Sequence, residues 1–211
     1  MNAQEELRQE TPSPAPAKNA PAKQAGWQFF LTVGLKLLLI CAVVAAIVSL
    51  VNALTAAKAE ENLKEEKRKA IIAIFGRDDL RYEKADGTDV YLVYDGANAL
   101  LGYSVESVSG GFGGDMTLMV GYDGARTILG VSIVSHSETP GLGARVKTEA
   151  GYLDQYVGKS GEVVLNKNGV ADGENDVDAI SGATISSRAV LTGVNRATDA
   201  LNAYLDSAKE G

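Results

Sequence analysis

The chain is short of the side chains that build many metal and redox centres. Its 211 residues include one cysteine, one histidine and one tryptophan. The single cysteine, Cys41, excludes an intrachain disulfide, a cysteine-based zinc site and a cysteine-ligated iron–sulfur cluster. The single histidine, His136, excludes a histidine-rich metal site or a haem held by two histidines within this chain alone.

Basic side chains are also too few for a nucleic-acid surface. Lysine and arginine number 20 against 27 aspartates and glutamates, which gives a formal net charge of −7. Because binding to a phosphate backbone requires a basic face, we expect no nucleic-acid partner. Hydrophobic residues make up 45% of the chain and charged residues 22%, as in globular proteins. The length predicts one domain with appendages.

The N-terminal part divides into a polar tail and an apolar segment. Residues 1–26 are rich in proline and alanine and predict a disordered tail. Residues 27–54 contain an uncharged run from Leu37 to Val51, and a helix needs about 20 apolar residues to cross a lipid bilayer. The segment therefore predicts a transmembrane anchor, with Lys36 reaching one interface. A cleaved signal peptide is the alternative, although the apolar stretch is longer than such peptides usually have.

The orientation of this anchor stays open on charge alone. More lysine and arginine residues follow the segment than precede it, which would place the C-terminal side in the cytoplasm. That rule weakens when a long domain follows, because long domains cross the membrane largely regardless of charge.

The remainder predicts a small α+β domain. Residues 55–76 show helical spacing and end at a glycine, so they predict a membrane-proximal helix, and the domain itself covers 77–211. A second helix is expected from Ser186 onward. Between the helices, short β-type runs predict an antiparallel sheet with a hairpin at Asp123-Gly124. These runs are Tyr91–Tyr94, Leu100–Val108, Met116–Tyr122 and Thr127–Ser135.

A loop of small residues, Asp178 to Ser187, precedes the last helix. Gly182 permits unusual backbone angles, and Ala183 leaves the neighbouring hydroxyl of Thr184 unobstructed. Ser186 or Ser187 is expected to cap the helix, whose free N–H groups and dipole favour an anion. The loop therefore suits a phosphate group beside Thr184, although loops of this kind are more often purely structural caps.

The same residues carry a resemblance to a known family. Asp178, Ser181, Gly182, Ala183 and Thr184 reproduce the pattern Asp-x-x-(Ser/Thr)-Gly-Ala-(Thr/Ser) in full, which resembles the flavinylation motif of FMN-binding domains. The resemblance implies that a flavin transferase uses FAD to attach FMN to Thr184 through a phosphoester.

Two further stretches fit this resemblance. Glu138 to Gly143 read Glu-Thr-Pro-Gly-Leu-Gly, similar to the family segment that lies against the flavin ring. Glu138 and Thr139 would then supply polar contacts and Leu142 an apolar face, whereas an ordinary Pro-Gly turn is the alternative. The glycine cluster around Gly113 either lets the backbone approach a ligand or forms a flexible hairpin loop.

The whole arrangement resembles the G subunit of Rnf electron-transport complexes. The resemblance implies an electron-carrying subunit with covalent FMN in a membrane ferredoxin:NAD oxidoreductase, rather than a stand-alone enzyme. It also implies partner membrane subunits, the cytoplasmic membrane as location and an extracytoplasmic C-terminal domain. The C subunit of sodium-pumping NADH:quinone reductase shares the motif but is typically longer. A non-redox membrane-anchored interaction module and a stand-alone extracytoplasmic reductase are the remaining alternatives.

No residue is expected to be a general acid–base catalyst or a metal ligand. His136 would either contact the flavin or lie at the surface, and Asp178 would either assist the transferase or be a solvated loop acid. Arg145 and Lys147 would neutralise the phosphate or simply be surface charges. A run of alternate acids lacks the glycine and terminal glutamate of a calcium-binding EF-hand: Asp172, Glu174, Asp176 and Asp178.

Overall fold

The computed structural model describes residues 25–166 and 175–210 and divides the chain into two compact units after Ala56. The predicted polar tail therefore lies outside the described residues, except for Ala25 and Gly26, which begin a helix. The first unit contains the apolar part of that helix, and the second contains all the strands.

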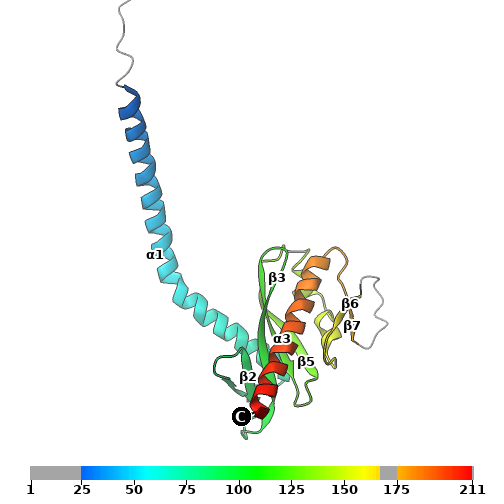
Figure 1. The fold of residues 1–211 in the computed structure, drawn as a ribbon. Coiled ribbons are helices and arrows are strands. Elements are labelled where there is room, and N and C mark those ends of the chain that lie inside the picture. The colour runs from blue at the N-terminus through cyan, green and yellow to red at the C-terminus, as the bar shows by residue number, and fades with distance from the viewer. Residues whose placement is uncertain (1–24, 167–174, 211) are drawn as a thin grey trace, which may run out of the picture. The chain divides into compact units, whose positions relative to one another are not determined.

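The predicted anchor and the predicted membrane-proximal helix form one element, helix α1, Ala25–Phe75 (Figure 1). By length and composition it is long and apolar enough to cross a membrane. Its large apolar side chains between Trp27 and Leu54 are exposed in the chain by itself, and a helix that is apolar on every face is typical of a membrane span. The helix ends at the predicted position, because Gly76 adopts a φ of 65° and its N–H donates to the Ile72 carbonyl at 2.8 Å.

The second unit is built on an antiparallel sheet of five strands in the order β1-β2-β3-β4-β5. The strands are β1 Arg81–Lys84, β2 Val90–Tyr94, β3 Leu100–Gly110, β4 Asp115–Tyr122 and β5 Ile128–Ser135. The four predicted strands are thereby confirmed. Strand β1 was not predicted, because three of its four residues are charged and give no apolar alternation.

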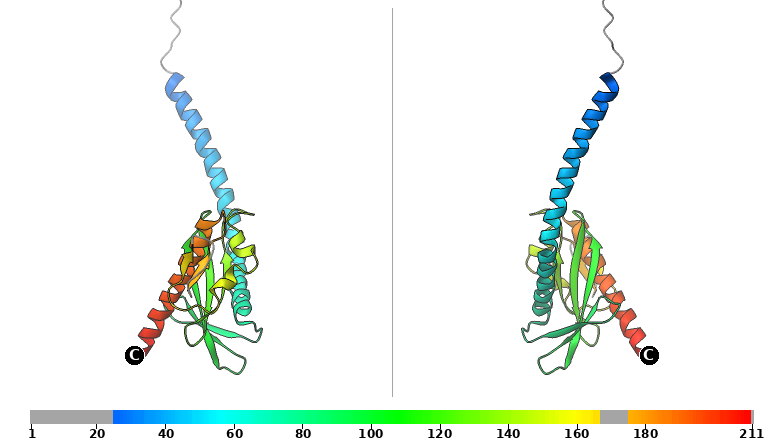
Figure 2. Two further views of the ribbon diagram at one scale, coloured as in Figure 1. Left: turned by 90° about the vertical axis from the view of Figure 1, so that its right-hand side faces the viewer. Right: turned by 90° about the vertical axis from the view of Figure 1, so that its left-hand side faces the viewer.

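Helices cover both faces of this sheet (Figure 2). Helix α3, Thr184–Glu210, buries Val190, Val194 and Leu201 against one face. On the other face, the 57–75 part of α1 packs Ile71 on the sheet and presses Ile74 onto Gly121, where an added Cβ would lie 2.2 Å from Ile74 Cγ2. The α+β prediction, with an antiparallel sheet between helices, is confirmed.

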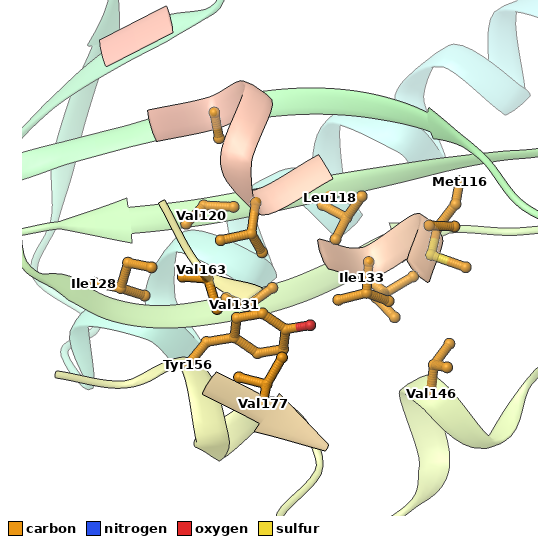
Figure 3. Packing of buried hydrophobic residues seen from close by; sticks show 14 of the residues in the cluster. Met116, Leu118, Val120, Ile128, Val131, Ile133, Val146, Tyr156, Val163 and Val177 are labelled. Carbon is orange, nitrogen blue, oxygen red and sulfur yellow. The ribbon is translucent and has the colours of Figure 1, made fainter. Parts of the chain in front are cut away.

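Short elements between β5 and α3 complete the main core. They are α2 Arg145–Thr148, the 3₁₀ helix η1 Leu153–Tyr156, and the parallel pair β6 Val164–Asn166 and β7 Asp176–Asp178. Tyr156, Val163 and Val177 lie beside sheet residues such as Val131 in this core (Figure 3). Because Val177 is fully buried, this layer fixes the point from which the chain leaves β7 toward α3.

Candidate functional site

The loop from β7 into α3 presents Thr184 at the first position of the helix. Gly182 has a φ of 79°, a conformation that a residue with a Cβ adopts only under strain. Ala183 donates its N–H to the Ile180 carbonyl at 2.9 Å and accepts the first helical bond from the Ser187 N–H at 2.9 Å. Thr184 itself is exposed, so its hydroxyl is accessible from solvent.

The expectation that Ser186 or Ser187 caps this helix is wrong, because the helix begins before both residues. The Ser187 hydroxyl instead accepts a hydrogen bond from the Ile180 N–H at 3.0 Å. The Ser186 hydroxyl donates to Glu138 Oε2 at 2.8 Å. The first turn of α3 contains no acidic residue, so its N–H groups and dipole favour an external anion near Thr184.

A pocket of about 270 Å³ opens beside Thr184. Its walls come from the β3–β4 hairpin tip, the turn after β5 and the start of α3. The apolar part is supplied by three largely exposed side chains, Phe112, Leu142 and Ile185. The complete lining is Phe112, Glu138, Thr139, Leu142, Gly143, Gly182, Ala183, Thr184, Ile185 and Ser186.

This combination fits FMN, which joins a flat, largely apolar ring system to a phosphate. The apolar side chains lie next to the exposed Thr184 hydroxyl and to a helix start that favours an anion. A Cβ at Gly182 would contact only Leu142 Cδ1, at 3.8 Å, so the backbone there is open to a ligand.

The pocket brings together most of the predicted site residues: Glu138, Thr139, Leu142, Gly182, Ala183 and Thr184. Gly113 does not line it. Its N–H donates to Glu138 Oε1 at 3.3 Å, and a Cβ there would lie 2.1 Å from the Ser137 carbonyl oxygen. Gly113 therefore allows the hairpin tip to approach the chain just before Glu138.

Asp178 and Ser181 line a separate pocket of about 400 Å³. There Arg145 donates to the Ser181 carbonyl at 3.0 Å and pairs with Glu149, so it braces the loop. The Asp178 N–H donates to Gln155 Oε1 at 2.7 Å, while its Oδ1 is buried without a hydrogen bond to any described residue. Asp178 and Ser181 therefore hold the loop in its conformation and do not line the pocket beside Thr184.

His136 likewise contacts the protein backbone and does not line the pocket. Its Nδ1 accepts a hydrogen bond from the Glu138 N–H at 3.2 Å. Phe112, Gly143, Ile185 and Ser186 were not predicted as site residues. Each lies inside or next to a stretch already singled out, but no pattern in the sequence indicated which way it faces.

Within residues 25–166 and 175–210, no three side chains of the metal-binding kinds lie close enough together to hold an ion. Two members of the alternate acidic run, Asp172 and Glu174, lie outside the described residues.

Comparisons with known proteins connect this pocket to flavin. A family model described as an FMN-binding domain matches residues 111–199, which include every residue that lines the pocket. The chain is 32% identical over 193 residues to the G subunit of the Na(+)-translocating ferredoxin:NAD(+) oxidoreductase complex of Acetobacterium woodii, covering 82% of this chain and 91% of that relative.

Two further similarities extend this comparison. The G subunit of the ion-translocating oxidoreductase complex of Methanosarcina acetivorans is 37% identical over 123 residues, or 56% of this chain and 62% of that relative. Among solved structures, NqrC of Shewanella oneidensis is 24% identical with a TM-score of 0.48, over 63% of this chain and 70% of that one.

Proposed function

Because the chain belongs to the G-subunit family of ion-translocating ferredoxin:NAD(+) oxidoreductase complexes, we propose that it is the FMN-carrying electron-transfer subunit of such a complex. We further propose that FMN is joined covalently to Thr184. The observation that carries the proposal is an exposed hydroxyl at the first residue of α3, beside an apolar pocket within the matched FMN-binding region.

Different residues of the pocket would hold the ring and the phosphate of the cofactor. Phe112, Leu142 and Ile185 offer apolar surface to the flavin ring, and the N–H groups at the start of α3 favour its phosphate. Bound FMN would supply one- and two-electron transfer, while the protein would position it. The pocket lining contains one ionisable side chain, Glu138, and both of its carboxylate oxygens accept hydrogen bonds from the protein.

Attachment to Thr184 is a transfer of FMN from FAD. The Thr184 oxygen forms a bond to the phosphorus on the riboflavin side, the pyrophosphate P–O bond breaks, and AMP leaves. The threonine proton passes to a base, which a separate flavin transferase would provide. Such an enzyme requires access to the hydroxyl, and Thr184 is exposed.

The other partners follow from the family and from helix α1. Residues 27–54 would anchor the chain in the cytoplasmic membrane, and other membrane subunits would exchange electrons with the flavin. We place the C-terminal domain on the extracytoplasmic side, where a flavin transferase of this kind works. The positive charges after the helix argue for the opposite orientation, but the long domain weakens that rule.

The attachment site is tested by mass. The full-length chain, produced together with a flavin transferase and purified in detergent, should carry one FMN-sized adduct that fluoresces after denaturing electrophoresis. Thr184→Ala should lose the adduct completely, whereas Thr184→Ser should keep it because a hydroxyl remains. Thr148→Ala, which removes an exposed threonine hydroxyl outside both the pocket and the motif, is the matched control. An adduct that persists on Thr184→Ala would show that another residue carries the flavin.

A further inference from the structure

A buried carboxylate joins the segments that form the pocket. Glu138 is 6% exposed, and its Oε1 accepts hydrogen bonds from the Phe112 N–H at 2.7 Å and the Gly113 N–H at 3.3 Å. Its Oε2 accepts from the Ser186 hydroxyl at 2.8 Å. The same side chain thus holds the β3–β4 hairpin tip and the first turn of α3.

Two glycines leave room for this carboxylate. A Cβ at Gly111 would lie 2.0 Å from Glu138 Oε1, and a Cβ at Gly143 would lie 2.2 Å from Oε2. Neither glycine has the left-handed backbone conformation that otherwise favours this residue. Glycine at both positions therefore leaves space for Glu138, and Gly143 also leaves space for Ser186 Oγ, which would lie 2.7 Å from its Cβ. Glu138 also donates its own N–H to His136 Nδ1.

We propose that Glu138 is a positioning residue that assembles the pocket in the unmodified chain, before any flavin is attached. It fixes Phe112 on one wall and the first turn of α3, which begins with Thr184, on another. Hydrogen bonds to a carboxylate are stronger than those between neutral groups, and a preformed site avoids ordering its walls during binding. The ligand assigned to the pocket rests on the proposed function. The hydrogen bonds that Glu138 accepts from Phe112, Gly113 and Ser186, here called the clamp, are a property of the protein alone.

The first experiment measures the clamp without flavin. The full-length chain is produced in a host without flavin transferase, purified in detergent and followed by amide hydrogen exchange. Glu138→Ala should accelerate exchange at Phe112 and Gly113 by about tenfold or more, because their acceptor is lost. Unchanged exchange at these amides would overturn the proposal. Glu162→Ala removes an exposed carboxylate and is the matched control.

The conservative variant separates geometry from charge. In Glu138→Gln the amide oxygen still accepts from Phe112, and the amide nitrogen donates to Ser186, whose hydroxyl accepts as well as donates. This variant should therefore keep exchange at Phe112 close to that of the original chain. Exchange as fast as in Glu138→Ala would show that the hydrogen-bond geometry is not what holds the hairpin tip.

Gly143→Ala tests the role of the glycine. The added methyl should displace the carboxylate and accelerate exchange at Phe112 in the original chain. In a Glu138→Ala, Ser186→Ala background the same change should add little, because the carboxylate and the Ser186 hydroxyl, whose oxygen lies 2.7 Å from the added Cβ, are both absent. Equal effects of Gly143→Ala in both backgrounds would contradict the proposal.

A final experiment connects the clamp to flavin and guards against loss of folding. With the transferase present, Glu138→Ala should carry several-fold less FMN than Glu138→Gln at equal times, and its remaining flavin should fluoresce with lower anisotropy. If circular dichroism shows Glu138→Ala unfolded, Ser186→Ala breaks only the α3 contact and should accelerate exchange at Ser187, whose N–H donates to the Ala183 carbonyl, but not at Phe112. Acceleration at both places, or at neither, would overturn the proposal. An original chain that accepts no FMN would refute the proposed function and leave the exchange results standing.

Discussion

At the scale of single residues, two buried tyrosines are expected to make the free energy of unfolding decrease at alkaline pH. Tyr122 and Tyr156 are fully buried, and burial raises the pKa of both phenols above the ordinary value. An unfolded tyrosine ionises near pH 10, about the model-peptide value, whereas these remain neutral in the folded protein. Below about pH 10 both states hold these protons and the free energy of unfolding is unaffected. Above about pH 10 only the unfolded state loses them, so the free energy of unfolding falls as the pH rises further.

Tyr122→Phe tests this coupling. The Tyr122 hydroxyl lies 3.0 Å from Thr198 Oγ1, so its loss should cost about 1 kcal/mol at neutral pH. Above about pH 10 the variant should lose stability less steeply than the original chain, by up to about 1.4 kcal/mol per pH unit. Urea unfolding of the full-length chain in detergent between pH 8 and 11 measures both effects. Parallel pH dependences would contradict the assignment.

The residues around Thr184 show what a contiguous motif can and cannot reveal. The motif indicated a helix start near Thr184, and α3 begins at Thr184 itself, two residues before the expected Ser186. The motif did not reveal that Glu138 bonds to Phe112 and Ser186, since those residues are 26 and 48 positions away in sequence. Contacts over such separations follow from strand register and helix packing, which short patterns do not encode.

At the scale of secondary-structure elements, the packing of α3 on β4 depends on Gly193. A Cβ at this position would lie 2.5 Å from Leu118 Cδ1. Alanine is favoured over glycine in helices by about 1 kcal/mol, whereas overpacking a core costs about 1–3 kcal/mol. The contact is so short that we expect overpacking to dominate.

Gly193→Ala should accordingly lower the free energy of unfolding, measured by urea titration of the full-length chain. In a Leu118→Val background, which removes the Cδ atoms, the same change should become neutral or stabilising. A stabilising Gly193→Ala in the original chain would show that α3 has room to move away from the sheet.

The elements that could be predicted are those with clear periodicity. Strand β4 alternates apolar residues with smaller ones, and Asp123 marks the following turn by accepting from the Ala125 and Thr127 N–H groups, each at 2.8 Å. The left-handed residue of that turn is Arg126 rather than the glycine, which the dipeptide pattern did not indicate. Strands β6 and β7 have three residues each, too few for periodicity to be detected.

At the scale of the whole molecule, the membrane orientation can be tested with the intact chain. A reporter that matures only outside the cytoplasm should be active when fused after Gly211. A reporter that is active only in the cytoplasm should be silent at the same position. The expected result follows from the proposal that an extracytoplasmic transferase attaches FMN, against the positive charges that follow the apolar part of α1. The reverse pattern would place Thr184 beyond the reach of such an enzyme.

Thr184 lies at the start of the last element of the chain, so it reaches its final position late in folding. The sheet strands and the Glu138 turn precede residue 184, so they leave the ribosome before α3 does. Thr184 becomes the first residue of a docked helix only after Val190, Val194 and Leu201 cover the sheet. A transferase that recognises the loop in this shape would modify finished domains and pass over incomplete chains. On the proposed function, FMN would then be attached to Thr184 only after the domain has folded.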